Sequence, residues 1–217
     1  MEFTRKYDVK ISEVNDKLIK MLRMVEDTIK NAITSLEERD TQLAKKTILD
    51  DKLVDALEAE IENDCLKLLL LEQPVAGDFR ELSAALKMIT DLERISDQAR
   101  DICEIVLQFN KEEYIKQIRH IPMMANIAVE MVKNSVTSYI NKDVAMAREL
   151  ETMDDTVDKL FVTVKNELVG YIQTDSENAD QAILFMMIAK YVERIADHAV
   201  NIGEWVEYYI TGKHRKY

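Results

Sequence analysis

Carboxylates spaced four residues apart recur along two segments of the chain. In one segment they are Glu93, Asp97 and Asp101, and the same spacing returns one hundred residues later at Glu193 and Asp197. Residues four apart lie one above another on a helix, so each segment would carry a ladder of acids with one turn per step. Carboxylate oxygens are hard ligands that suit Mg, Ca, Mn or Fe, and carboxylates from neighbouring helices can hold more than one ion. The spacing therefore makes metal binding a candidate function.

The two ladders belong to an internal duplication. Residues 93–104 return at 193–204 with seven identical positions, whereas ordinary residue frequencies would give about one. An inexact repeat that keeps its acids while their neighbours change indicates that the acids matter. The last rung differs, because Asn201 stands where the first copy has Asp101.

A second pair of acids accompanies each ladder. Asp51 and Asp55 precede the first ladder, and Asp154 and Asp158 occupy the matching positions of the second copy at an offset of 103. If the helix with each pair faces the helix with each ladder, several carboxylates converge on one edge of each half. Their mutual repulsion would then need a cation to offset it. The alternative is a solvated acidic surface neutralised by arginines such as Arg94.

Other reactive residues give little support for catalysis. His198 follows the acid of the second ladder and could ligate a metal or bond to a carboxylate, but its counterpart is Gln98, which argues against a required ligand role. A ferritin-like di-iron enzyme needs Glu-x-x-His on its helices, and the chain contains none. No Gly-rich phosphate loop, Ser/His/Asp set or Cys/His set is present either. We therefore predict that the protein is not an enzyme.

The composition restricts the partners and the compartment. With 41 acidic and 29 basic residues the formal charge is −12, which argues against nucleic acid and anionic lipid and favours cations or basic protein surfaces. The longest apolar run, 182–189, is far below the roughly twenty residues that a bilayer requires. Residues 1–7 lack the features of a secretory signal, so we expect a cytoplasmic protein. Cys65 and Cys103 lie within apolar patterns and are expected to be buried and reduced.

Long helices are the elements that would position these residues. Apolar residues at helical spacing predict three helices in each half. The expected ranges are 8–38, 41–72, 78–110, 113–141, 143–173 and 176–211. Short connections between helices of roughly 45 Å force antiparallel neighbours. The sequence thus predicts an all-α fold of two tandem, pseudo-symmetric three-helix bundles, with domains at 1–110 and 111–217.

The helix boundaries follow from local signals. Asp40, Asp143 and Asp175 are suitable N-caps. The junction at 110–112 contains neither Gly nor Pro, so a helix could continue through it. Pro122 predicts a kink or a late start of the fourth helix.

Several of these motifs together resemble the PhoU family. They are Glu-Arg-Ile-x-Asp-x-Ala at 93–99 and 193–199, the Asp-x-x-x-Asp pairs at 51/55 and 154/158, and the loop Gln73-Pro74-x-Ala-x-Asp-x-Arg80. The resemblance covers nearly the whole chain in the same order and spacing. It implies two three-helix bundles and, as in some members, clusters of Fe or Zn held by the Asp/Glu-x-x-x-Asp motifs.

The resemblance also implies which residues hold metal here. The implied ligands are Asp51, Asp55, Glu93, Asp97 and Asp101 in one site, and Asp154, Asp158, Glu193 and Asp197 in the other. Asn201 replaces the last acid of the second ladder, and Gln98 replaces a histidine often found in the first. The two sites are therefore expected to load metal unequally.

The implied role is regulatory. PhoU proteins are similar in acting as negative regulators that link a phosphate ABC transporter, through its ATPase subunit, to a membrane sensor histidine kinase. The resemblance thus implies an adaptor that represses phosphate uptake and the phosphate-starvation response, forms a homodimer and reaches the membrane only through partners. A metal-storage protein or metal-dependent helical carboxylate enzyme is one alternative. An accessory subunit of another phosphate transporter is the other.

Overall fold

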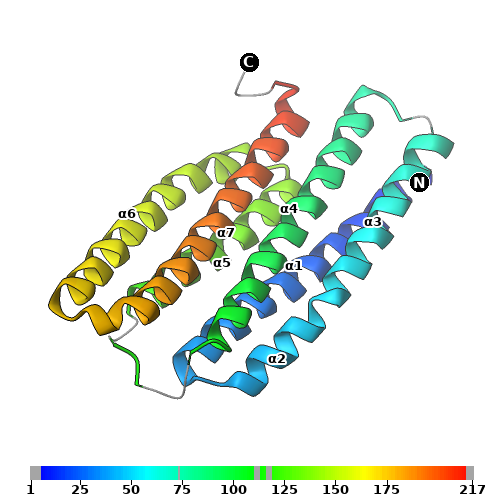
Figure 1. The fold of residues 1–217 in the computed structure, drawn as a ribbon. Helices are drawn as coiled ribbons and strands as arrows, with labels where there is room; N and C mark the ends of the chain where they lie inside the picture. The colour runs from blue at the N-terminus through cyan, green and yellow to red at the C-terminus, as the bar shows by residue number, and fades with distance from the viewer. Residues whose placement is uncertain (1–5, 73, 110–112, 116–118, 214–217) are drawn as a thin grey trace.

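The computed structural model describes residues 6–72, 74–109, 113–115 and 119–213, and their regular structure is helical (Figure 1). No strand occurs within these ranges. The elements are α1 (Lys6–Glu38), α2 (Thr41–Asp50), α3 (Lys52–Leu71), α4 (Ala76–Val106), α5 (His120–Asn141), α6 (Val144–Thr174), η1 (Ser176–Asn178) and α7 (Ala179–Thr211). The predicted all-α fold is confirmed.

The helices form two three-helix bundles in chain order. In the first, α2 and α3 lie end to end and take the place of one long helix beside α1 and α4, while α5, α6 and α7 form the second (Figure 1). The third helices, α4 and α7, pack against each other and join the two bundles. The tandem pseudo-symmetric arrangement predicted from the repeat is confirmed.

One hydrophobic core runs through both bundles. On α1, Leu18, Met21, Val25 and Ile29 recur at three- and four-residue spacing and are fully buried, which is the stripe that a helix needs to pack against its neighbours. Burying side chains of this size stabilises the fold by about 1.5–3 kcal/mol each. Cys65 and Cys103 also lie in this core and are free thiols, as predicted.

Two helix starts are capped at corresponding places of the repeat. Asp40 accepts hydrogen bonds from two backbone N–H groups at the start of α2, and Asp143 accepts one at the start of α6. Each cap follows a residue with positive φ, Arg39 or Lys142, at +55° in both. The reversal of chain direction is therefore built in the same way in both halves, and the predicted caps are confirmed.

The second helix of the first bundle differs from the prediction. The range 41–72 was expected to form one helix, but α2 ends at Asp50 and α3 begins at Lys52. At the break, the carbonyl of Asp51 accepts a tight bond of 2.8 Å from the N–H of Val54 as well as a longer one of 3.3 Å from Asp55. The corresponding helix of the second bundle, α6, is continuous. The break coincides with the burial of the Asp51 side chain, which is 3% exposed.

The connection between the bundles also differs. A helix could have continued through the junction, but α4 ends at Val106 and residues 107–109 and 113–115 are not helical, whereas residues 110–112 lie outside the described ranges. The fourth helix begins at His120 rather than at 113. Pro122 thus lies in its first turn, where the missing N–H of proline has no partner to lose, and the predicted late start is confirmed.

A membrane crossing would require a helix that is both long and strongly apolar. None of the helices in the described ranges meets that requirement.

Candidate carboxylate sites

The implied metal ligands lie on matching helices of the two bundles. We call Asp51, Asp55, Glu93, Asp97 and Asp101 the first carboxylate strip, which lies between the α2–α3 pair and α4. We call Asp154, Asp158, Glu193 and Asp197 the second carboxylate strip, which lies on α6 and α7. The two strips differ in how their charges are balanced.

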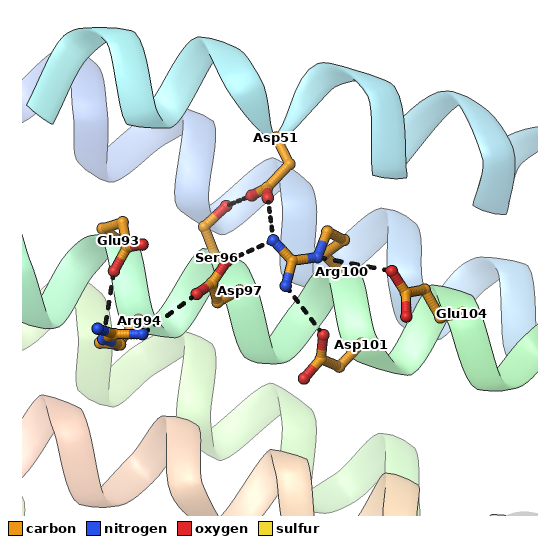
Figure 2. Close-up of polar contacts among 8 residues, drawn as sticks. All are labelled: Asp51, Glu93, Arg94, Ser96, Asp97, Arg100, Asp101 and Glu104. Carbon is orange, nitrogen blue, oxygen red and sulfur yellow. Dashed lines mark hydrogen bonds and ion pairs between the residues drawn. The ribbon is translucent and has the colours of Figure 1, made fainter.

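Arg100 lies in the middle of the first strip (Figure 2). Its Nη1 is 3.0 Å from Oδ2 of Asp51 and 2.5 Å from Oδ1 of Asp97, and its Nη2 is 3.1 Å from Oδ1 of Asp101. The other oxygen of Asp51 accepts a hydrogen bond of 2.6 Å from Oγ of Ser96. Three of the five implied ligands are therefore bound to a cation that belongs to the protein itself.

Arg94 balances the outer edge of the first strip more weakly. Its guanidinium is 3.5 Å from a carboxylate oxygen of Glu93 and 3.5 Å from one of Asp97 (Figure 2). Because the side chain of Arg94 is 57% exposed, solvent screens these pairs, and each is worth about 0–1 kcal/mol. The inner arginine, Arg100, is thus the main counter-ion.

The remaining acids of the first strip are short of positive charge. Burial, followed by the charge of Asp97, raises the pKa of Glu93 to about 6. Burial, followed by the charges of Asp51 and Asp97, also raises the pKa of Asp55 above its usual value. Burial works to lower the pKa of Arg100, but the hydrogen bond to Asp101 and the neighbouring charges outweigh it and raise that pKa. Arg100 therefore stays charged at any pH at which the protein is folded.

The second strip lacks this internal counter-ion. At the offset of the repeat, Val200 replaces Arg100 and Ala196 replaces Ser96. Both groups that bond to the buried carboxylate of the first strip are thus apolar in the second.

Asp154 shows the effect of these replacements. Its Oδ1 is buried and accepts no hydrogen bond in the described part of the chain. Burial first, and then the charges of Asp158 and Asp197, raise the pKa of Asp154 to about 6. Among the described residues no cation pairs with these three aspartates, whereas Glu193 pairs with Lys190, which is half exposed.

The implied ligand sets fit a metal unequally. The first strip does not fit, because Arg100 already binds the oxygens of Asp51, Asp97 and Asp101. The second strip fits better by donor chemistry, because Glu193 is its one acid paired with a cation in the described residues, and a buried oxygen of Asp154 has no hydrogen-bond partner there. Within the described ranges no three His, Cys, Asp or Glu side chains are already arranged to hold an ion. Metal binding by these residues therefore stays a prediction.

His198 contacts a carboxylate outside both strips. Its Nδ1 is 2.8 Å from Oδ1 of Asp91, which lies on α4 of the other bundle. Sequence reasoning left a metal-ligand role and a carboxylate partner open for His198, and the structure shows the carboxylate partner. Sequence reasoning did not identify Asp91 or Arg100 as functional residues. Comparison of the two copies would have singled out Arg100, because it is the cation that one ladder has and the other lacks.

Fold and site together define a class of protein: an all-helical chain of two repeated three-helix bundles, each with an acidic strip between its second and third helices. The PhoU domain family model matches the chain twice, at residues 18–106 and 121–206. The chain belongs to the PhoU family, and the resemblance inferred from its motifs is confirmed.

Relatives and solved structures agree with this assignment. The phosphate-specific transport system accessory protein PhoU homolog of Clostridium acetobutylicum is 34% identical over 212 residues, which cover 97% of each chain. The protein of the same name from Aquifex aeolicus is 35% identical over 184 residues, covering 85% of this chain and 83% of that one. The crystal structure of PhoU from Pseudomonas aeruginosa superposes with a TM-score of 0.91 at 27% identity, covering 96% of this chain and 100% of that one.

Proposed function

We propose that this protein is a negative regulator of phosphate uptake and of the phosphate-starvation response. In this proposal it is a non-catalytic cytoplasmic adaptor, active as a homodimer, that couples the ATPase subunit of a phosphate ABC transporter to a sensor histidine kinase. The observation that carries the proposal is the match of both halves to the PhoU domain, together with relatives named as phosphate-specific transport accessory proteins.

The charge of the chain supports a protein-docking role. A formal charge of −12 repels nucleic acid and anionic lipid headgroups and attracts basic protein surfaces. An adaptor with this surface reaches a membrane transporter through the protein partner rather than through the bilayer.

Metal has a structural place in this proposal. The second strip would hold a divalent cation such as Fe, Zn or another hard ion through Asp154, Asp158, Glu193 and Asp197. The support is the partnerless buried oxygen of Asp154 and the lack of a pairing cation for it in the described residues. The bound cation would supply positive charge that offsets the repulsion among these acids.

Deletion of the gene tests the regulatory proposal. In phosphate-rich medium the deletion strain should take up more phosphate and show raised output of the sensor kinase, and the plasmid-borne gene should restore both. Unchanged uptake together with unchanged kinase output would contradict the proposal. A pull-down of the tagged protein from cells grown in high phosphate should recover the transporter ATPase and the kinase.

A metal-storage or metal-dependent enzymatic role is the second candidate, and the state of Asp154 favours it. The double variant Asp154→Asn/Asp197→Asn separates the two roles in the complementation assay. If this variant loses its metal yet still restores regulation, the metal is not the regulatory function. If metal and regulation are lost together while the variant stays folded, the two are linked.

A further inference from the structure

Comparison of the two halves, position by position, shows that Arg100 has no charged counterpart in the second half, where Val200 takes its place. In the first half Asp51 is satisfied by Ser96 and Arg100. In the second half both donors are replaced by side chains without polar atoms, and the equivalent Asp154 has a buried oxygen without a hydrogen-bond partner in the described ranges. Four of the five acids of the first strip are kept in the second copy, where Asn201 replaces Asp101, and the main difference lies in the source of the positive charge.

The guanidinium occupies the position that a bound cation would need. It lies within 3.1 Å of oxygens from three carboxylates on two helical segments, and one of these, Asp51, is almost fully buried. A metal ion would have to bind the same oxygens at about 2.0–2.6 Å. The two cations would compete for these carboxylates, because their positive charges repel each other at this distance.

Arg100 also holds an advantage over a dissociable ion. It is covalently attached, always charged and shaped to bind carboxylates with several N–H groups at once. To displace it, a metal would have to move the guanidinium out of hydrogen bonds with Asp51, Asp97 and Asp101. Because the carboxylate of Asp51 is buried, the loss of its bond to Arg100 costs free energy that a metal would have to offset.

We propose that Arg100 serves as a built-in counter-ion that takes the place of a metal ion in the first carboxylate strip and closes that half to metal. The comparison with the second half rests on the metal binding proposed above. The two halves of the repeat then balance similar acids by different means, one with a permanent side chain and the other with an exchangeable ion.

Metal counting in a background without the second strip tests the proposal. The parent variant is Asp154→Asn/Asp197→Asn, stripped with chelator, equilibrated with Mn²⁺ and dialysed, with bound Mn²⁺ counted by elemental analysis. Arg100→Val, which introduces the residue of the second half, is expected to gain about one Mn²⁺ per chain over this parent. Adding Asp97→Asn should abolish the gain, and Arg100→Lys, which keeps the charge, should bind no more than the parent.

Two results would overturn the proposal. The first is that the parent, in which Arg100 is intact, binds Mn²⁺ and loses it when Asp97→Asn is added. The other is a folded Arg100→Val protein that binds no more Mn²⁺ than the parent. Arg100→Gln provides a second neutral variant that still offers a hydrogen-bond donor to Asp51, and it should show the same gain if the valine variant does not fold.

Thermal unfolding gives a readout independent of metal counting. Mn²⁺ should raise the Tm of Arg100→Val and leave that of the parent unchanged. An absence of second-strip Mn²⁺ in protein with Asp154 and Asp197 intact would count against the proposed metal function. That result would not change the Mn²⁺ gained by Arg100→Val over the parent. Failure of the proposed metal function and failure of the Arg100 proposal can therefore be told apart.

Discussion

Oδ1 of Asp91 in α4 lies 2.8 Å from Nδ1 of His198 in α7, and this contact joins the two bundles where their third helices pack together. Both side chains are mostly buried, at 16% and 21% exposure. The repeat does not reproduce this pair, because Tyr191 and Gln98 occupy the equivalent positions. The junction between the halves is therefore less symmetric than the halves themselves.

The Asp91–His198 pair should contribute to the stability of the whole chain. Asp91→Asn and His198→Gln, the latter introducing the residue of the other copy, should each lower the free energy of unfolding by about 1–2 kcal/mol. A double-mutant cycle from urea unfolding should give a coupling of about 1 kcal/mol. Strictly additive effects would mean that the contact does not stabilise the junction.

Equivalent aspartates of the two strips should respond oppositely to neutralisation. In metal-free protein kept in chelator, Asp51→Asn should lower the free energy of unfolding by about 2–4 kcal/mol, because it breaks a buried ion pair with Arg100. Asp154→Asn should raise the Tm by about 2–4 °C, because it removes a charge that no cation pairs with among the described residues. Changes of the same sign would contradict the asymmetry between the strips.

The benefit of Asp154→Asn should depend on pH. In metal-free protein the folded pKa of Asp154 is about 6, above the ordinary 3.8. When folding raises the pKa of an acid, that acid does not lower the free energy of unfolding at a pH below its ordinary pKa. The free energy of unfolding then falls as the pH rises through the folded pKa. Urea unfolding in chelator should therefore show little difference between variant and wild type near pH 4 and the full difference above about pH 7. Glu130→Gln, on an exposed site of α5, is the control and should change stability little at any pH.

At Gly203 the backbone of α7 approaches α6 closely. A Cβ at this position would lie 2.7 Å from Cδ1 of Leu150 and 2.9 Å from the backbone oxygen of Ala147. Gly203→Ala should therefore cost about 1–3 kcal/mol, because the helix backbone cannot easily move aside. Gly170→Ala is the matched control, since nothing lies within 4 Å of a Cβ there, and it should gain up to about 1 kcal/mol from helix propensity. Thermal unfolding of the two variants should shift in opposite directions.

Helix positions were largely predictable because their signals are local. Apolar spacing, the capping aspartates and Pro122 act within one or two turns of the backbone, and both ends of α1 and α6 and the start of α2 lie close to the predicted positions. The break at Asp51 was not predictable in this way. It accompanies contacts of Asp51 with Ser96 and Arg100, which lie 45 and 49 residues away.

The sequence by itself determined the duplication, the all-helical fold and the membership of each acid in one of two strips, since these depend on periodicity along the chain. Only the tertiary structure decided how each strip is neutralised and what His198 contacts. A long arginine side chain has many rotamers and can reach several helices, so its partners depend on how the helices pack. Packing against α4 gave Asp51 a permanent cation, and packing against α7 left Oδ1 of Asp154 buried with no hydrogen-bond partner among the residues that the structure describes.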